Sequence, residues 1–271
     1  MVGSVNTNIG AQIALQNLNT TSVDLANVQK QISTGLKVSD ALDNGAVFAI
    51  AQGLRSDVTA ISTVNSQLGA AKGLLQVANA ASTGVSNTLS DVRSVLVQLA
   101  DPNVTGNART QLNAQYDSLK KAVSNYISGC SYNGSSILSA GSGNKPVIQD
   151  MSANQYTIHA QDLTANVANV LTSVSDSTGA AALLTGNFVS AQNFVGTALN
   201  SIAADTHFIE NQITFNNAIS DATTAGVGAL VDADLAKESA RLQSLQIKQQ
   251  LGTQSLGIAN QAPQSLLGLF R

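Results

Sequence analysis

The feature that most constrains the fold is an apolar row that recurs every seven residues between positions 61 and 99. The row consists of Ile61, Leu68, Leu75, Leu89 and Leu96, with Ser82 as its one polar member, and a companion row runs beside it through Val64, Ala71, Ala78, Val85, Val92 and Leu99. Such a seam predicts one continuous helix of roughly 60 Å, at about 1.5 Å per residue, within a coiled coil. Asp101 and Pro102 predict its end.

Both ends of the chain carry shorter apolar rows in segments without charge. The first charged residue is Asp24, and none follows Lys248 until Arg271. Leu18, Leu25 and Ile32 form the N-terminal row, on a helix that Gly35 should end. A second helix should begin near Asp232, after a break at glycines 226 and 228. One of its apolar stripes comprises Leu235, Leu242, Leu245 and Leu256, and a second comprises Ile247, Leu251 and Ile258.

The middle of the chain changes character. A helix is predicted over 107–128, and turn residues at 132–136 and 140–146 with short strand-like runs predict one or two β-hairpins within 130–165. Residues 166–187 are small and polar, partly helical or loose, and helix returns from 188 to about 224.

These elements predict a mainly α fold. We expect an elongated antiparallel helical hairpin, or coiled-coil bundle, with a small β-hairpin region near the middle of the chain. The two end segments should pair, the inner helices should pair, and the β piece should cap the far end. The expected division is 1–45, 46–130, 131–187, 188–228 and 229–271.

Composition argues against several classes of function. Charged residues make up 11% of the chain, against about 25% in ordinary domains, and the formal charge of −3 gives no reason to expect a nucleic-acid partner. No run has the roughly 18 apolar residues of a membrane span, and the first residues do not resemble a secretory signal peptide. His159 and His207 are isolated, and Cys130 has no neighbouring base. We therefore expect no enzyme, no cofactor and no metal.

The charge-free ends are explained by a repeating assembly. When identical chains stack, every buried charge meets its own copies and costs desolvation and repulsion. Uncharged amides and hydroxyls avoid both costs, and the apolar rows of the end helices form an assembly seam. A free coiled-coil adaptor is the alternative from another class, but it does not need both ends to lack charge.

Four stretches carry a resemblance to a known family. "ISTGLKVSDALDNGAVFAIAQGL" (32–54), "VRSVLVQLAD" (92–101), "YNGSSIL" (132–138) and the C-terminal "VDADLAKESARLQSLQIKQQLGTQSLGIANQAPQSLLGLFR" resemble the motifs of bacterial flagellin. The resemblance spans essentially the whole chain, in a short form that lacks most of the variable outer domain. Two departures are the "LLGLF" ending and the short segment near 140–185.

The resemblance implies a structural subunit that polymerises with itself into the extracellular flagellar filament for swimming motility. It implies export in an unfolded state by the flagellar type III apparatus with a chaperone, and contact with filament cap and hook-junction proteins. The end helices would form the inner tube, and the row from Ile61 to Leu96 would form the core of the outer coiled-coil layer. A hook–filament junction protein is the alternative within the same class.

The resemblance also bears on two sets of surface positions. In flagellins sensed by the flagellin-specific Toll-like receptor, the long inner helix carries Q-R-V-R-E-L, and a Glu lies on the next helix. Alignment places Asp91 where the first Arg belongs and Gln115 where that Glu belongs. Because some flagellins carry O-glycans, the hydroxyls near the β-rich region are candidate attachment sites: Ser173, Ser175, Ser177, Thr178, Thr185, Ser190 and Thr197.

Overall fold

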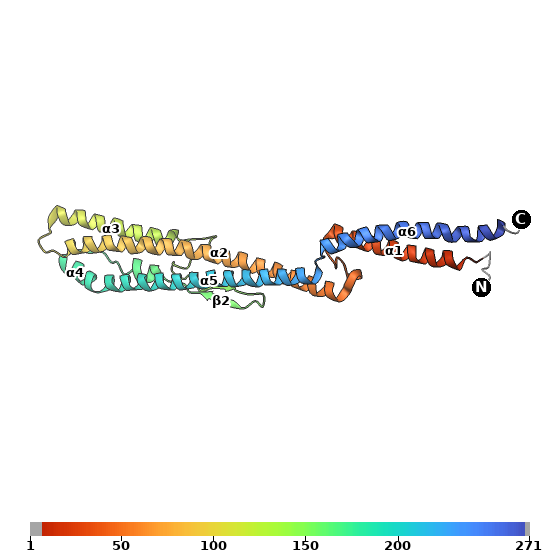
Figure 1. Cartoon of the computed structure of the whole chain (residues 1–271). Coiled ribbons are helices and arrows are strands. Elements are labelled where there is room, and N and C mark those ends of the chain that lie inside the picture. The colour runs from red at the N-terminus through yellow and green to blue at the C-terminus, as the bar shows by residue number, and fades with distance from the viewer. Residues whose placement is uncertain (1–6, 269–271) are drawn as a thin grey trace. The chain divides into compact units, whose positions relative to one another are not determined.

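The computed structural model describes residues 7–268, with side chains up to residue 261 (Figure 1). It confirms a mainly α fold with one small antiparallel sheet. The elements are α1 (Ile9–Thr34), α2 (Ala41–Leu99), α3 (Gly106–Gly129), β1 (Lys145–Ile148), β2 (Gln155–Ile158), a π-helical turn η1 (Thr164–Ala168), α4 (Ser177–Thr185), α5 (Asn187–Val231) and α6 (Leu235–Gly268).

The chain forms two compact units. The terminal unit contains the residues up to 56 and those from 222 onward, and the central unit contains residues 57–221. Helices α2 and α5 each contribute to both units. The division into five segments is finer than these two units and stays a prediction.

Helix α2 confirms the continuous helix predicted from the heptad row. Asn44 alone departs from helical geometry, with φ −164° and ψ 99°, and its side-chain oxygen accepts a hydrogen bond from the Val47 amide at 3.2 Å. The regular helix therefore begins after an Asn cap. All five apolar members of the row are buried: Ile61, Leu68, Leu75, Leu89 and Leu96. They pack into the core of the central unit or at its border.

The corner between α2 and α3 is held by one arginine. Arg109 of α3 donates to the carbonyl oxygens of Leu99 at 3.0 Å, Asp101 at 3.3 Å and Val104 at 2.9 Å. The last carbonyls of a helix have no partner within the helix itself. A planar guanidinium with several donors satisfies carbonyls from both sides of the turn at once.

The β-hairpin lies against the middle of α5, so the expectation that it caps the far end was wrong. Strands β1 and β2 pair from Lys145 with Ile158 to Ile148 with Gln155. The buried carboxylate of Asp205 on α5 accepts hydrogen bonds from the Tyr156 hydroxyl at 2.7 Å and from the His159 amide at 3.0 Å. These bonds fix the hairpin along the helix. There is one hairpin within 130–165, and a separate tight turn at Tyr132–Ser135.

A layer of uncharged amides joins α2, α5 and the hairpin. Asn216 of α5 is buried, and its side chain donates to the side-chain oxygen of Asn65 on α2 at 3.0 Å and to the Gln149 carbonyl at 3.1 Å. Asn65 in turn donates to Asn217 at 2.8 Å. Asn216 stands seven residues after the buried Ile209, so it occupies an apolar row. A buried amide at such a position fixes the register of packed helices.

The segment after the hairpin is more ordered than its composition indicates. Residues 166–187 were expected to be partly helical or loose, but they contain part of η1 and the helix α4. Their apolar side chains lie in the core of the central unit: Val167, Leu171, Val174, Ala180 and Leu183. The free energy gained by burying these apolar side chains offsets the conformational entropy that is lost when a segment rich in Ser, Thr and Gly becomes ordered.

Helix α5 passes through the glycines at 226 and 228, so the predicted break there was wrong. Each Gly costs a helix about 1 kcal/mol relative to Ala. Val227 and Val231 are nevertheless buried together with Val38 and Ala51 in a small core of the terminal unit. This packing keeps the segment helical, and α6 begins at Leu235 rather than near Asp232.

Candidate assembly surface

Helices α1 and α6 lie side by side, as the paired end segments predicted (Figure 1). Val28 of α1 is 1% exposed and Leu245 of α6 is 6% exposed, so these two side chains are buried in the pair. The Asn8 side chain donates to the Ala259 carbonyl at 2.6 Å. At Gly252, an added Cβ would lie 3.2 Å from the Leu18 side chain, so the glycine permits close contact there.

The predicted seam divides by exposure into three sets. Leu245 is buried, Leu18, Leu25, Ile32, Leu242 and Leu256 are half-buried, and Leu235, Leu251 and Ile258 are exposed. The exposed set therefore does not contribute to the core between α1 and α6. Further exposed apolar side chains of α1 were not predicted as part of the seam: Ile9, Ile13, Leu15 and Val23. Ile247, which is also exposed, belongs to the second apolar stripe predicted for the last helix.

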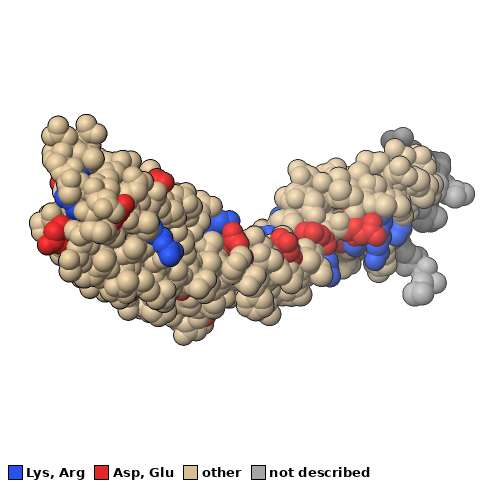
Figure 2. Space-filling model, turned by 90° about the vertical axis from the view of Figure 1, so that its left-hand side faces the viewer, with Lys and Arg blue, Asp and Glu red and all other residues tan. Residues whose placement is uncertain are grey.

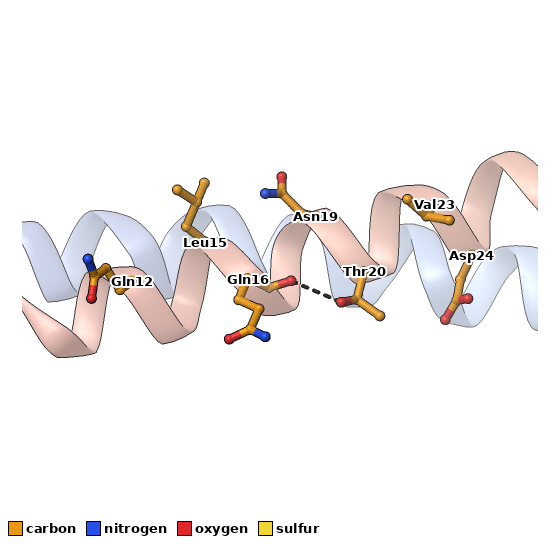
Figure 3. Close-up of a pocket in the computed structure, with 7 residues that line it drawn as sticks. All are labelled: Gln12, Leu15, Gln16, Asn19, Thr20, Val23 and Asp24. Atoms are coloured by element: carbon orange, nitrogen blue, oxygen red, sulfur yellow. Dashed lines mark hydrogen bonds between the residues drawn. The ribbon is translucent and has the colours of Figure 1, made fainter.

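A groove runs along α1 on a face that the sequence analysis did not single out (Figure 3). Leu15, Asn19 and Val23 form one ridge at a spacing of four residues. Gln12, Gln16, Thr20 and Asp24 form the other ridge at the same spacing. Ridges of this spacing with a groove between them are the surface into which the side-chain ridge of another helix packs. The i, i+8 spacing of Leu15 and Val23, about two helical turns, was the sequence signal that could have identified this face.

The face is almost free of charge. Within the described residues of α1, no charged side chain precedes Asp24, and within those of α6 none follows Lys248. Figure 2 shows that Lys, Arg, Asp and Glu cover only a small part of the visible surface of the molecule. A second chain can therefore cover the part of this face that precedes Asp24 without desolvating a charged side chain of α1.

The N-terminal helix meets the start of α2 at a cluster of charges that the sequence analysis did not predict. The Lys30 ammonium lies 2.6 Å from an oxygen of Asp40 and 2.8 Å from an oxygen of Asp43. Asp43 also accepts hydrogen bonds from the amide and hydroxyl of Ser39, each at 2.9 Å. Hydrogen bonds to Lys30 lower the pKa of both carboxyl groups, and the two carboxylates raise the pKa of Lys30.

Backbone pairing completes this junction within the terminal unit. The Lys37 amide donates to the Val231 carbonyl at 2.7 Å, and the Ala233 amide donates to the Gly35 carbonyl at 3.0 Å. Gly35 has φ +72°, which lets the chain leave α1 in the left-handed conformation that glycine adopts without strain. The predicted stop at this glycine is confirmed.

The charge cluster should make the terminal unit sensitive to pH. The lowered carboxyl pKa values give stability that is complete above about pH 4 and is lost as the pH falls through the folded-state values. The raised pKa of Lys30 gives stability that is complete below about pH 10 and is lost above its folded-state value. The melting temperatures of wild type and Lys30→Met, measured by circular dichroism, should therefore differ near neutral pH and converge at both extremes. A constant difference at every pH would contradict this role.

No arrangement typical of a metal site was found in the part of the chain that the structure describes, since no three His, Cys, Asp or Glu side chains are grouped to hold an ion. No helix among residues 7–268 is both long and apolar enough to span a membrane. Cys130 is buried, and burial raises the pKa of its thiol. The notable surface of the terminal unit is therefore the apolar face of its helix pair.

Comparison with known proteins shows to which family the chain that carries this surface belongs. Residues 5–143 match the bacterial flagellin N-terminal helical region, and residues 190–270 match the bacterial flagellin C-terminal helical region. The chain belongs to the flagellin family. It is 38% identical to flagellin FljO of Caulobacter vibrioides over 271 residues, which cover 100% of this chain and 99% of FljO. It is 34% identical to a flagellin of Brucella melitensis over 290 residues, with 100% of both chains covered.

This flagellin is a structural subunit of the bacterial flagellar filament and polymerises with itself. Its length is that of the short relatives, which it matches from end to end. The alternatives of a junction protein and a free adaptor gain no support from these comparisons.

The other predicted surface positions of the flagellin lie on the central unit. Asp91 on α2 and Gln115 on α3 are both exposed. Six of the seven hydroxyl candidates are exposed, namely Ser173, Ser175, Thr178, Thr185, Ser190 and Thr197, while Ser177 is half-buried. They lie before α4, on α4 and on the first part of α5.

Proposed function

We propose that α1 and α6 supply the contacts that join subunits in the filament. The observation that carries this proposal is the two-ridged groove of α1, in which Asp24 is the one charged lining side chain, together with the exposed apolar side chains Leu235, Leu251 and Ile258 of α6. A pair of helices leaves apolar faces that it cannot bury by itself. Copies of the same pair around a common axis bury those faces against one another.

The lack of charged side chains at both ends of the chain suits packing in a tubular polymer. In a helical polymer each buried charge is repeated in every subunit, and each copy costs several kcal/mol when it has no partner. Amides and hydroxyls such as those of Gln12, Gln16, Asn19 and Thr20 hydrogen-bond to neighbours or to water without this cost. We infer that the end helices form the inner layers of the filament, with an uncharged polar face towards the channel.

The route to assembly is inferred from the family. The subunit would be exported unfolded by the flagellar type III apparatus with its chaperone, and would be added outside the cell beneath the filament cap. Hook-junction proteins would contact the first subunits. An interface made by the chain ends suits this route, because the ends would complete their folding only when they contact neighbouring subunits in the filament.

Electron microscopy of the concentrated protein tests the proposal. Long tubes whose reconstruction places α1 and α6 at the smallest radius would support it. Discrete oligomers would favour a coiled-coil adaptor instead. Tubes in which the central unit lines the channel would show that the end helices have another role.

We also propose O-glycosylation at the exposed hydroxyl candidates of the central unit. Ser173, Ser175 and Thr178 lie close together around the start of α4, where a glycan would project into solvent. Protein from its native filament is expected to exceed the 27.7 kDa of the polypeptide by whole sugar residues. An intact mass equal to that of the polypeptide would contradict the modification.

A further inference from the structure

The four tyrosines of the chain fall into two pairs with different surroundings. Tyr116 is buried, and its hydroxyl donates to the Thr172 carbonyl at 2.8 Å. The Tyr156 hydroxyl donates to Asp205, and its ring stacks on Phe208 at 3.8 Å between centroids. Tyr126 and Tyr132 are instead 47% and 39% exposed, and their hydroxyls have no hydrogen-bond partner among the residues the structure describes.

Both exposed rings rest on glycines of α2. A Cβ added at Gly73 would lie 2.8 Å from the Tyr132 ring, and one added at Gly84 would lie 2.9 Å from the Tyr126 ring. Any larger residue would displace the rings outward. The rings are therefore held against the α2 backbone, and much of their conformational freedom is lost before any partner binds.

An apolar pocket opens beside Tyr126. Helix α2 contributes Val77, Ala80 and Ala81, and the end of α3 contributes Tyr126 itself, with Cys130 at its C-cap. The pocket exposes more apolar than polar surface. Tyr126 is thus a restrained aromatic side chain with an unused hydroxyl at an apolar pocket, and tyrosine is one of the residue types enriched among the side chains that dominate binding energy at protein interfaces.

The two segments that line the pocket lack charged residues. No Lys, Arg, Asp or Glu occurs in residues 73–90 of α2 or in residues 122–144, which include the end of α3. A nucleic acid or an acidic peptide would find no cation in these segments. The chemistry fits an uncharged protein surface that brings an apolar side chain.

We propose that this tyrosine pocket binds a second copy of the chain in the filament, through an apolar side chain from a different part of the neighbour's surface. The inference rests on the filament function, because copies of the same chain are then the neighbours of every subunit. A pocket that accepts a different surface of the next copy makes a heterologous contact. Such contacts propagate into open helical polymers instead of closing as two-fold dimers.

Photo-cross-linking from position 126 gives a direct test. The probe is p-benzoylphenylalanine in place of Tyr126, irradiated in assembled filaments and in depolymerised subunits. Covalent dimers and higher multimers are expected only in filaments, and mass spectrometry should map the partner peptide outside 73–90 and 122–144. Filaments that yield no intermolecular product, or a product that joins position 126 to the same face of its neighbour, would overturn the proposal.

Substitutions test the energetics independently. Tyr126→Ala should raise the critical concentration for polymerisation about tenfold or more. Tyr126→Phe keeps the ring and loses the hydroxyl, so it should raise the critical concentration about two- to tenfold. Met151→Ala on the hairpin turn removes a side chain that is 46% exposed and serves as the control, with an expected change below about twofold.

The outcomes separate this inference from the filament function. If wild type forms filaments and both Tyr126 variants polymerise like it, the tyrosine pocket has no role in assembly. If wild type forms no filaments, the self-assembly on which the inference rests fails with it. Melting of depolymerised Tyr126→Phe should match that of wild type, which shows that the central unit is intact.

Discussion

Removal of residues 236–271 is expected to abolish filament formation while the central unit stays folded. The deletion removes α6 after its first residue and leaves α1 without its partner, whereas the core of residues 57–221 contains no residue from the deleted segment. Sedimentation and electron microscopy measure filaments, and circular dichroism with thermal melting measures the remaining fold. A truncated chain that still forms filaments would contradict an assembly role for α6.

Single substitutions separate pairing of α1 and α6 from contacts between subunits. Leu251 is 58% exposed, so Leu251→Lys should leave the helix pair intact yet prevent assembly, because every copy would bury an unpaired charge at a cost of several kcal/mol. Leu251→Gln is the matched uncharged control and should weaken assembly less. Leu256→Lys, at a half-buried position, should disturb both the pair and the filament. Equal polymerisation of Leu251→Lys and wild type would place this side chain outside the interface.

The largest effect on a host response is expected for Asp91→Arg combined with Gln115→Glu. Wild type should be sensed poorly by the flagellin-specific Toll-like receptor, because the motif resemblance implies that Asp91 takes the position where sensed flagellins carry an Arg. The change from Arg to Asp reverses a charge and removes a planar group with five donors. Restoration of one buried charged hydrogen bond is worth about 2–5 kcal/mol, or roughly thirty-fold to several-thousand-fold in affinity.

The positions of both residues in the structure allow the double variant to be compared directly with wild type. Asp91 and Gln115 are exposed on α2 and α3, while Val92 and Tyr116 beside them are buried. The double variant should therefore fold like wild type. A receptor reporter assay on depolymerised protein measures the effect, with Asp91→Asn as a control that removes the negative charge without adding donors. Strong signalling by wild type, equal to that of a flagellin with the complete motif, would refute the prediction.

Local sequence patterns predicted the elements whose cause is local. The heptad row predicted the continuous helix over 61–99, because side chains seven residues apart lie on one face of a helix wherever it packs. Gly35 predicted the end of α1, because glycine adopts a positive φ without strain. The turn at Tyr132–Ser135 was predicted for the same reason, since Asn133 and Gly134 have φ of 49° and 72°.

Where the predictions were wrong, distant residues decided the structure. Glycines 226 and 228 indicated a break, yet packing of Val227 and Val231 with Val38 and Ala51 keeps α5 helical. The hairpin lies along α5 because the Asp205 carboxylate holds Tyr156 and the His159 amide. Neither contact follows from spacing along the chain, because each joins residues more than forty positions apart.

The sequence by itself determined the helical class, the apolar rows and the uncharged ends, and its motifs were sufficient to indicate the flagellin family. Only the tertiary structure separated the half-buried seam residues such as Leu18 and Leu242 from the exposed Leu251 and Ile258. It alone placed Lys30 between two carboxylates, and Tyr126 and Tyr132 on glycines of α2. The physical reason is that periodicity specifies which side chains share a face of a helix. The exposure of that face depends on which other segments pack against it.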